Sequence, residues 1–224
     1  MAAAASPRPF LGRRPFLGRR SGARIGLLGG SFNPAHAGHL HVSREALKRL
    51  GLDRVWWLVA PQNPLKPTAD MAPYAARLAS AARIARGPRI AVSDLEARWR
   101  ARYTADTLTR VARRYRGVRF VWLMGADSFA ELDRWRHWSR IFRRVVIAVF
   151  ARAPYDSGAL AGKPARRFRR ARLGPSQARR LAERSPPAWV FLPLRRHPAS
   201  ASAIRAAAKR AAGASATRRR SNPY

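Results

Sequence analysis

The chain has 224 residues and no cysteine, and its 46 lysine and arginine residues against 11 aspartate and glutamate residues give a formal charge of +35. This length suits one compact domain with at most a small appendage. The lack of cysteine excludes a disulfide scaffold, a thiol nucleophile and a zinc or iron–sulfur site with cysteine ligands. No apolar run approaches the roughly 18 residues of a membrane-spanning helix. A hydrophobic content of 47% is sufficient for a folded core.

The positive charge leaves two explanations open. A strongly basic chain attracts polyanions, and nucleic acid is the first candidate partner. However, 42 of the basic residues are arginine and the chain holds 44 alanines, a combination typical of a GC-rich genome. We favour genome composition and do not expect nucleic-acid binding, although the same charge would draw in an anionic substrate such as a polyphosphate.

The two ends of the chain differ from its middle. Segment 1–23 carries Pro-Phe-Leu-Gly-Arg-Arg twice in tandem, at 9–14 and 15–20, and its Pro and Gly residues interrupt any regular helix. It is Arg-rich like a transit peptide but lacks the amphipathic period of one, and it lacks the apolar stretch of a secretory signal. We expect disordered basic tails at 1–23 and 213–224 around one folded domain at 24–212, in a cytoplasmic protein.

Between the tails, apolar runs alternate with segments of helical spacing. In chain order, the sequence predicts a strand at 24–29, a helix from near 38 to 50, a strand at 54–60, a helix at 73–86, a strand at 89–92, a helix at 104–115, strands at 118–124 and 144–150, a helix at 175–184, a strand at 189–194 and a helix at 202–212. The run at 54–60 is apolar almost throughout, as in a strand buried on both faces. This alternation predicts an α/β fold, a Rossmann-like doubly wound parallel sheet with helices on both faces. Ligands of such sheets bind beyond the carboxyl ends of the strands, where the strand order reverses.

The segment 163–180 breaks the alternation. It carries eight lysine and arginine residues, and no acidic residue lies between Asp156 and Glu183. We interpret it as a solvated basic loop rather than an RNA- or membrane-binding patch, because Phe168 is its one aromatic residue.

The turn after the first strand holds the strongest chemical signal. Residues 29–39 read Gly-Gly-Ser-Phe-Asn-Pro-Ala-His-Ala-Gly-His. Paired glycines let backbone N–H groups approach an anion, and the following helix points its positive end at the same place. His36 and His39 stand three residues apart, so both can donate hydrogen bonds to phosphate oxygens as charge builds up there. The pattern predicts a phosphate-binding turn.

Other interpretations of the glycines and histidines fit less well. A zinc site that includes His41 is not expected, because His39 and His41 face different sides of a helix and no third ligand stands nearby. The glycines do not match the dinucleotide-binding Gly-x-Gly-x-x-Gly pattern. A P-loop at 158–163 has the wrong spacing, and Pro164 occupies the place of its Ser or Thr.

The turn resembles the signature of the nucleotidylyl transferase superfamily, whose His-x-Gly-His motif binds the phosphates of ATP. A second motif of that superfamily, Ile-Ser-x-Thr-x-Ile-Arg, is similar to residues 199–205 and also opens a helix. This resemblance implies that Ser200, Ser202 and Arg205 contact the triphosphate, with Arg205 supplying a fixed positive fork.

Three further segments resemble the nicotinate mononucleotide adenylyltransferase family within this superfamily. They are Gly125-Ala126-Asp127 with Leu132, Trp135 and Trp138 behind it, Tyr103-Thr104-Ala105-Asp106-Thr107, and Pro61-Gln62-Asn63-Pro64-Leu65-Lys66. The resemblance implies transfer of the adenylyl group of ATP to nicotinate mononucleotide, giving deamido-NAD and pyrophosphate, with Mg²⁺ carried by ATP and no metal site of the protein's own. This chain departs from the family pattern at Ser31, Asn33, Arg102, Ala199 and Ser202.

The resemblance assigns a role to each matched residue. The implied catalytic residues are His36, His39, Lys66 and Arg205. The implied ATP site comprises Gly29, Gly30, Ser31, Phe32, His36, Gly38, His39, Gly125, Asp127, Ser200, Ser202, Ile204 and Arg205. The implied mononucleotide site comprises Asn63, Lys66, Tyr103, Thr104 and Trp135, with Trp135 stacked on the pyridine ring. Four further tryptophans are expected in the core, namely Trp56, Trp57, Trp122 and Trp138.

Several questions stay open at this point. A phosphopantetheine adenylyltransferase or a cytidylyltransferase would share the first turn, and a basic RNA-binding protein with a relic fold is an alternative from another class. The sequence determines neither the choice between nicotinate and nicotinamide mononucleotide nor the oligomeric state, and a homo-oligomer remains compatible with it.

Overall fold

The computed structural model describes residues 22–62, 65, 69, 71–152, 156–194, 201, 204–207 and 210. Nearly all of the predicted tails lies outside these residues. Four of the predicted site residues, Asn63, Lys66, Ser200 and Ser202, also lie outside them.

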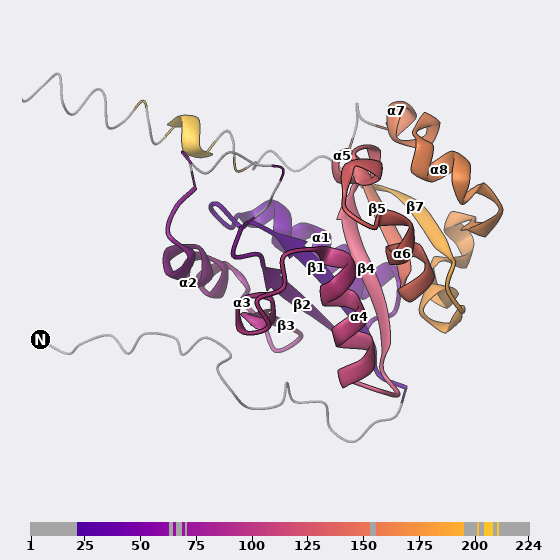
Figure 1. The fold of residues 1–224 in the computed structure, drawn as a ribbon, viewed down its shortest axis with the longest axis horizontal. Coiled ribbons are helices and arrows are strands. Elements are labelled where there is room, and N and C mark those ends of the chain that lie inside the picture. Colours follow the sequence, from indigo (N-terminus) through magenta and orange to yellow (C-terminus); the bar gives the residue numbers. More distant parts are fainter. Residues whose placement is uncertain are drawn as a thin grey trace, which may run out of the picture.

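Seven parallel strands form one sheet in the order β3-β2-β1-β4-β5-β7-β6 (Figure 1). The strands are β1 (Arg24–Gly30), β2 (Arg54–Val59), β3 (Ile90–Ser93), β4 (Arg119–Gly125), β5 (Val146–Arg152), β6 (Arg172–Leu173) and β7 (Trp189–Leu194). The chain adds strands outward from β1 to one edge and then returns to add β4 on its other side. The order therefore reverses between β1 and β4, as predicted for a doubly wound sheet.

Helices connect the strands. They are α1 (Ala37–Arg49), α2 (Tyr74–Ile84), α3 (Leu95–Arg98), α4 (Thr104–Arg114), α5 (Ala126–Ala130), α6 (Trp138–Arg144), α7 (Asp156–Ala161) and α8 (Lys163–Arg167), with 3₁₀ helices η1 (Leu132–Arg134), η2 (Arg169–Ala171) and η3 (Pro175–Glu183). Residues 204–207 and 210 of the last predicted helix are also helical, as is residue 201 directly before it. In the part of the chain that the structure describes, no helix combines the length and the apolarity needed to cross a membrane.

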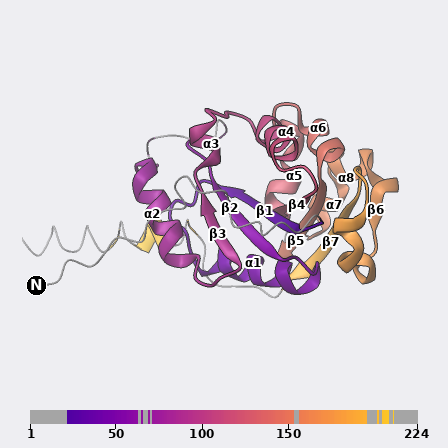
Figure 2. The ribbon, with the colours of Figure 1, turned by 90° about the horizontal axis from the view of Figure 1, so that it is seen from below.

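Two apolar clusters cover the two faces of the sheet. One cluster joins alternate strand residues such as Trp56 and Trp122 to α4, α5 and α6, and the other joins their neighbours, such as Trp57 and Leu123, to α1, α2 and η3. Figure 2 shows α4 and α6 on one side of the sheet and α1 on the other. Strands buried on both faces need apolar side chains at every position, which explains the continuous runs in the sequence. The predicted fold class is confirmed.

The prediction of a loop at 163–180 is wrong, since this segment forms α8, η2, β6 and most of η3. Pro164 and Ala165 are buried and anchor it, whereas its eight basic side chains are exposed. The two residues of β6 are too few to show an alternating pattern, so no strand signal is visible there along the chain. The helix predicted at 175–184 exists, but as the 3₁₀ helix η3.

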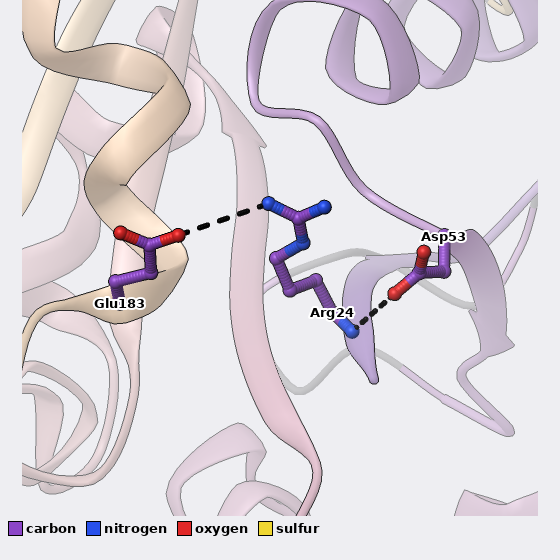
Figure 3. Close-up of polar contacts among 3 residues, drawn as sticks. All are labelled: Arg24, Asp53 and Glu183. Carbon is purple, nitrogen blue, oxygen red and sulfur yellow. Dashed lines mark hydrogen bonds and ion pairs between the residues drawn. The ribbon is translucent and has the colours of Figure 1, made fainter. Parts of the chain in front are cut away.

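Polar contacts close the amino end of the sheet (Figure 3). The backbone N–H of Arg24 donates to Asp53 Oδ2 at 2.7 Å, and its guanidinium lies 3.9 Å from Glu183 Oε1. Both side chains of this ion pair are partly exposed, so it contributes little to stability. These contacts connect β1 to the residue before β2 and to η3 at the end of the sheet opposite the candidate site.

Candidate active site

Two adjoining cavities lie at the carboxyl ends of β1 and β4, where the strand order reverses. The first, of about 510 Å³, contains His36, His39 and Arg205 in its wall and is called the histidine cavity here. The second, of about 430 Å³, contains Tyr103 and Thr104 and is called the tyrosine cavity. The two share six wall residues: Gly29, Gly30, Ser31, Trp122, Ser128 and Trp135. Two ligands bound in these cavities would therefore meet over the turn after β1.

The two histidines of the turn form a reciprocal cap on α1. His36 is the N-cap residue, and its Nδ1 accepts the N–H of Gly38 at 3.1 Å. His39 Nδ1 accepts the N–H of His36 at 3.2 Å, and the two ring centroids lie 3.9 Å apart. A nitrogen that accepts such a bond carries no proton, so each neutral ring bears its hydrogen on Nε2. Both rings lie in the wall of the histidine cavity.

Buried aromatic rings hold the second histidine in place. The Phe32 ring lies 4.7 Å from the His39 ring and stacks on Trp57 at 5.1 Å. Trp57 Nε1 donates to Ser43 Oγ at 2.8 Å, and Ser43 Oγ donates to the carbonyl of His39 at 2.9 Å. Phe32 itself has a φ of 48°, in the left-handed region that non-glycine residues rarely adopt. The turn is therefore a strained segment that its surroundings keep in one shape.

Two glycines of the predicted ATP site have another side chain close to their Cα, a buried ring at Gly29 and a carboxylate that can rotate away at Gly125. A Cβ on Gly29 would lie 2.3 Å from Cη2 of Trp122, and a Cβ on Gly125 would lie 2.2 Å from Oδ1 of Asp127. Gly29, Gly125 and Asp127 all line the histidine cavity. The end of β1 at Gly29 thus packs against the Trp122 ring of β4 without space for a side chain at position 29.

Arg205 of the C-terminal motif reaches the first turn. Arg205 Nη1 donates to the carbonyl of Asn33 at 2.8 Å, which joins residues 172 positions apart. Asn33 Oδ1 in turn accepts the N–H of Ala72 at 3.1 Å. Ile204, which the resemblance placed in the ATP site, is outside the wall of either cavity and 37% exposed.

The tyrosine cavity combines aromatic walls with a cationic rim. The guanidinium groups of Arg102 and Arg136 lie 5.7 Å and 5.2 Å from the centre of the Tyr103 ring, and all three residues line the cavity. Trp135 lies in the walls of both cavities and is partly buried against the core. Such a cavity suits a flat ligand that carries negative charge.

Apart from Ile204, each described residue of the predicted site lines one or both of the cavities. The histidine cavity brings together Gly29, Gly30, Ser31, Phe32, His36, Gly38, His39, Gly125, Asp127, Trp135 and Arg205. The tyrosine cavity brings together Tyr103, Thr104 and Trp135 beside Gly29, Gly30 and Ser31.

Sequence reasoning missed several wall residues. Trp122 was expected only in the core; it is 2% exposed, yet it lies in the walls of both cavities. Among the residues that the structure describes, its Nε1 and Ser31 Oγ have no hydrogen-bond partner. Glu96, Arg134 and Arg136 carry no local motif, and only the meeting of distant segments reveals them. Nowhere in the described part of the chain do three His, Asp or Glu side chains gather as a metal site would require.

Glu96 is a buried carboxyl in the wall of the tyrosine cavity. Burial raises the pKa of Glu96 from its ordinary value of 4.5 to about 7, and a hydrogen bond with the Thr107 side chain partly opposes this rise. The folded protein therefore holds a proton on Glu96 between pH 4.5 and 7 that the unfolded chain releases. Stability from this group is present below pH 4.5 and is lost as the pH rises to 7.

We expect Glu96→Gln to remove this pH dependence. The difference in unfolding free energy between pH 5 and pH 8 should be smaller in the variant than in the natural chain, by up to about 3 kcal/mol. Urea unfolding at pH 5 and at pH 8 measures this difference in unfolding free energy. Asp106→Asn, at an exposed acid on neighbouring α4, is the matched control and should leave the pH dependence unchanged. Equal pH slopes for the natural chain and Glu96→Gln would contradict the prediction.

Comparisons with known proteins cover most of the chain. A family model described as cytidylyltransferase-like matches residues 27–207. A Cereibacter sphaeroides protein named "Probable nicotinate-nucleotide adenylyltransferase" is 53% identical over 182 residues, which are 81% of this chain and 96% of that protein. A Parvibaculum lavamentivorans protein of the same name is 50% identical over 184 residues, 82% of this chain and 92% of that protein. The solved structure of Plasmodium falciparum nicotinic acid mononucleotide adenylyltransferase complexed with NaAD has the same fold, with a TM-score of 0.61 at 15% identity over 82% of each chain.

Proposed function

The chain belongs to the family of nicotinate-nucleotide adenylyltransferases, and we propose that it transfers the adenylyl group of ATP to nicotinate mononucleotide in the synthesis of NAD. The products are deamido-NAD and pyrophosphate. The observation that carries this proposal is the meeting of two cavities over one turn, one with two histidine N–H donors and one with aromatic walls.

The reaction requires positioning rather than a general base. An oxygen of the mononucleotide phosphate attacks the α-phosphorus of ATP, and the bond from that phosphorus to the bridging oxygen of pyrophosphate breaks. The attacking phosphate is already an anion at neutral pH, so no proton has to be removed. The protein must hold two polyanions in line and stabilise the negative charge on the leaving group.

The histidine cavity offers groups for the leaving pyrophosphate. His36 and His39 would donate from Nε2, and Arg205 would add a positive fork held in place by the carbonyl of Asn33. ATP enters as its magnesium complex, and the ion neutralises part of the triphosphate charge. Asp127 at the end of β4 would accept from a ribose hydroxyl of the adenosine.

The tyrosine cavity would receive the mononucleotide. Trp135 would stack on the pyridine ring, while Tyr103 and Thr104 would frame it. The arginines at the rim would attract its carboxylate and phosphate. Asn63 and Lys66, which the resemblance assigns to this substrate, follow the cavity residues Ala60 and Gln62 in the chain. We also propose that residues 24–212 form one catalytic domain and that the protein is cytoplasmic.

Pyrophosphate release by the purified protein tests the function directly. ATP and Mg²⁺ are supplied with nicotinate mononucleotide, nicotinamide mononucleotide or phosphopantetheine in parallel, and CTP replaces ATP in a further reaction. Release that requires both ATP and nicotinate mononucleotide supports the proposal. Release that requires phosphopantetheine or CTP instead would show that the enzyme uses that substrate. No release with any acceptor, together with RNA retention that weakens as salt rises, would favour a nucleic-acid-binding protein.

We expect Trp135→Ala to raise the KM for the mononucleotide by about tenfold, because stacking of a base on an aromatic ring contributes roughly 1–3 kcal/mol. Trp135→Phe keeps an aromatic face, so its KM for the mononucleotide should lie between those of the natural chain and Trp135→Ala. Initial rates at varied mononucleotide and saturating ATP measure the effect. An unchanged KM in Trp135→Ala would remove this residue from the mononucleotide site.

A further inference from the structure

Arg77 is a buried arginine on α2 that the proposed reaction does not use. It is 2% exposed and lies in the wall of neither cavity. Among the described residues no carboxylate lies within ion-pair distance of it. Burial lowers the pKa of its guanidinium, which is the direction expected for a cation removed from water. A buried charge of this kind is costly unless other groups compensate it.

Backbone carbonyls supply the compensation. Nη1 donates to Ser31 O and to Ala60 O, each at 2.7 Å, Nη2 donates to Pro61 O at 2.5 Å, and Nε donates to Ala72 O at 3.0 Å. The guanidinium carbon also lies 5.4 Å from the centre of the Tyr74 ring. One side chain thus satisfies four carbonyl oxygens at once.

These carbonyls belong to the segments that build the substrate cavities. Ser31 lies in the phosphate-binding turn and in the wall of both cavities. Ala60 directly follows β2 and lines the tyrosine cavity. Ala72 precedes α2, and its N–H is bound by Asn33 of the same turn. Arg77 therefore connects the turn after β1, the loop after β2 and the start of α2.

The bond to Ser31 also determines the direction of a backbone donor. In a trans peptide the N–H points opposite to the preceding C=O. The carbonyl of Ser31 is turned toward Arg77, so the N–H of Phe32 points away from Arg77. Phe32 is the residue held at a φ of 48°, and it lines the histidine cavity. A fixed orientation of this N–H costs nothing at the moment of reaction, because no reorganisation is then required.

We propose that Arg77 is a positioning residue that holds the phosphate-binding turn and the loop after β2 in one geometry, so that the two substrates meet in line. It touches neither substrate and acts through Ser31, Ala60, Pro61 and Ala72. This inference rests on the proposed function for its catalytic readout, and ATP binding provides a second readout that does not depend on it.

The first experiment compares Arg77→Lys and Arg77→Ala with Arg89→Lys and Arg89→Ala. Arg89 also donates to two backbone carbonyls, those of Leu52 and Asp53, but at the other end of the sheet. Lysine keeps the charge yet cannot reach four carbonyls at once. We expect Arg77→Lys to stay folded at the assay temperature with a lower unfolding midpoint than the natural chain, because some of the buried carbonyls lose their donor. Its kcat should fall at least about tenfold, and the kcat of Arg77→Ala should fall about 10²-fold. The Arg89 variants should keep kcat and both KM values.

The second experiment adds guanidinium chloride at low millimolar concentration to Arg77→Ala. We expect it to occupy the vacated space and restore kcat severalfold, with no effect on Arg89→Ala. If Arg77→Ala does not fold, the comparison of Arg77→Lys with Arg89→Lys tests the proposal by itself. A folded Arg77→Lys with unchanged kcat and KM values, or equal losses in the Arg89 variants, would overturn the proposal.

Failure of the proposed function gives a different result. The natural chain would then release no pyrophosphate with any acceptor. Calorimetry with ATP would decide in that case: weaker binding by Arg77→Lys but not by Arg89→Lys supports the positioning role, and equal binding by all three proteins overturns it.

Discussion

Replacing His39 with alanine should lower kcat by about 10²–10³-fold, the usual cost of losing one hydrogen-bond donor to a developing charge. The expectation rests on the reciprocal cap: each histidine uses Nδ1 to accept a backbone N–H, so the hydrogen of a neutral ring sits on Nε2, the nitrogen that we propose donates to the ligand. His36→Ala should lower kcat similarly and also cost roughly 1 kcal/mol of stability, because His36 is the N-cap of α1. Initial rates of pyrophosphate release at saturating substrates measure both effects.

A third variant separates catalysis from capping. Asparagine is a good N-cap residue, so His36→Asn should restore the unfolding midpoint while kcat stays low. His137→Ala is the matched control, since His137 is exposed, caps α6 without a side-chain hydrogen bond and lies in the wall of neither cavity. Full activity in His36→Asn and His39→Ala would show that the histidines serve the fold alone.

The fold and the phosphate-binding turn could be predicted because their signals are local. A strand buried on both faces has to be apolar along its length, and residues 54–60 show this directly. The turn 29–39 combines glycines, histidines and a helix start within eleven residues, so its chemistry is visible without any tertiary contact.

The residues that sequence reasoning missed depend on distant contacts. Arg77 and Arg83 stand in the same Ala- and Arg-rich helix, and nothing in their surroundings along the chain distinguishes them. In the folded protein Arg77 is buried and donates hydrogen bonds to four backbone carbonyls, whereas Arg83 is exposed. Trp122 likewise fits an ordinary core strand until β4 is placed beside β1 and its ring covers Gly29. Short helices such as α5 and α7 contain fewer than two turns, too few to show an apolar period.

Gly29→Ala should damage both stability and activity, because the added Cβ would lie 2.3 Å from Cη2 and 3.0 Å from Cζ2 of Trp122. The Trp122 ring is 2% exposed and cannot move without disturbing the core, so overpacking should cost about 1–3 kcal/mol. The same shift would displace the wall that both cavities share, and kcat should fall about 10²-fold. Urea unfolding and pyrophosphate release measure the two effects.

Two further variants make the cause of this loss testable. Gly30→Ala adds the same methyl group one residue later, where its nearest neighbour outside the adjoining residues would be Phe32 Cε2 at an ordinary 3.4 Å, so stability should change little. Trp122→Phe removes the ring atoms that collide with Gly29→Ala, and the double variant should be more stable than the sum of the two single losses predicts by about 1 kcal/mol or more. Additive losses would show that Trp122 does not set the requirement for glycine at position 29, and the close approach of β1 and β4 would then need another explanation.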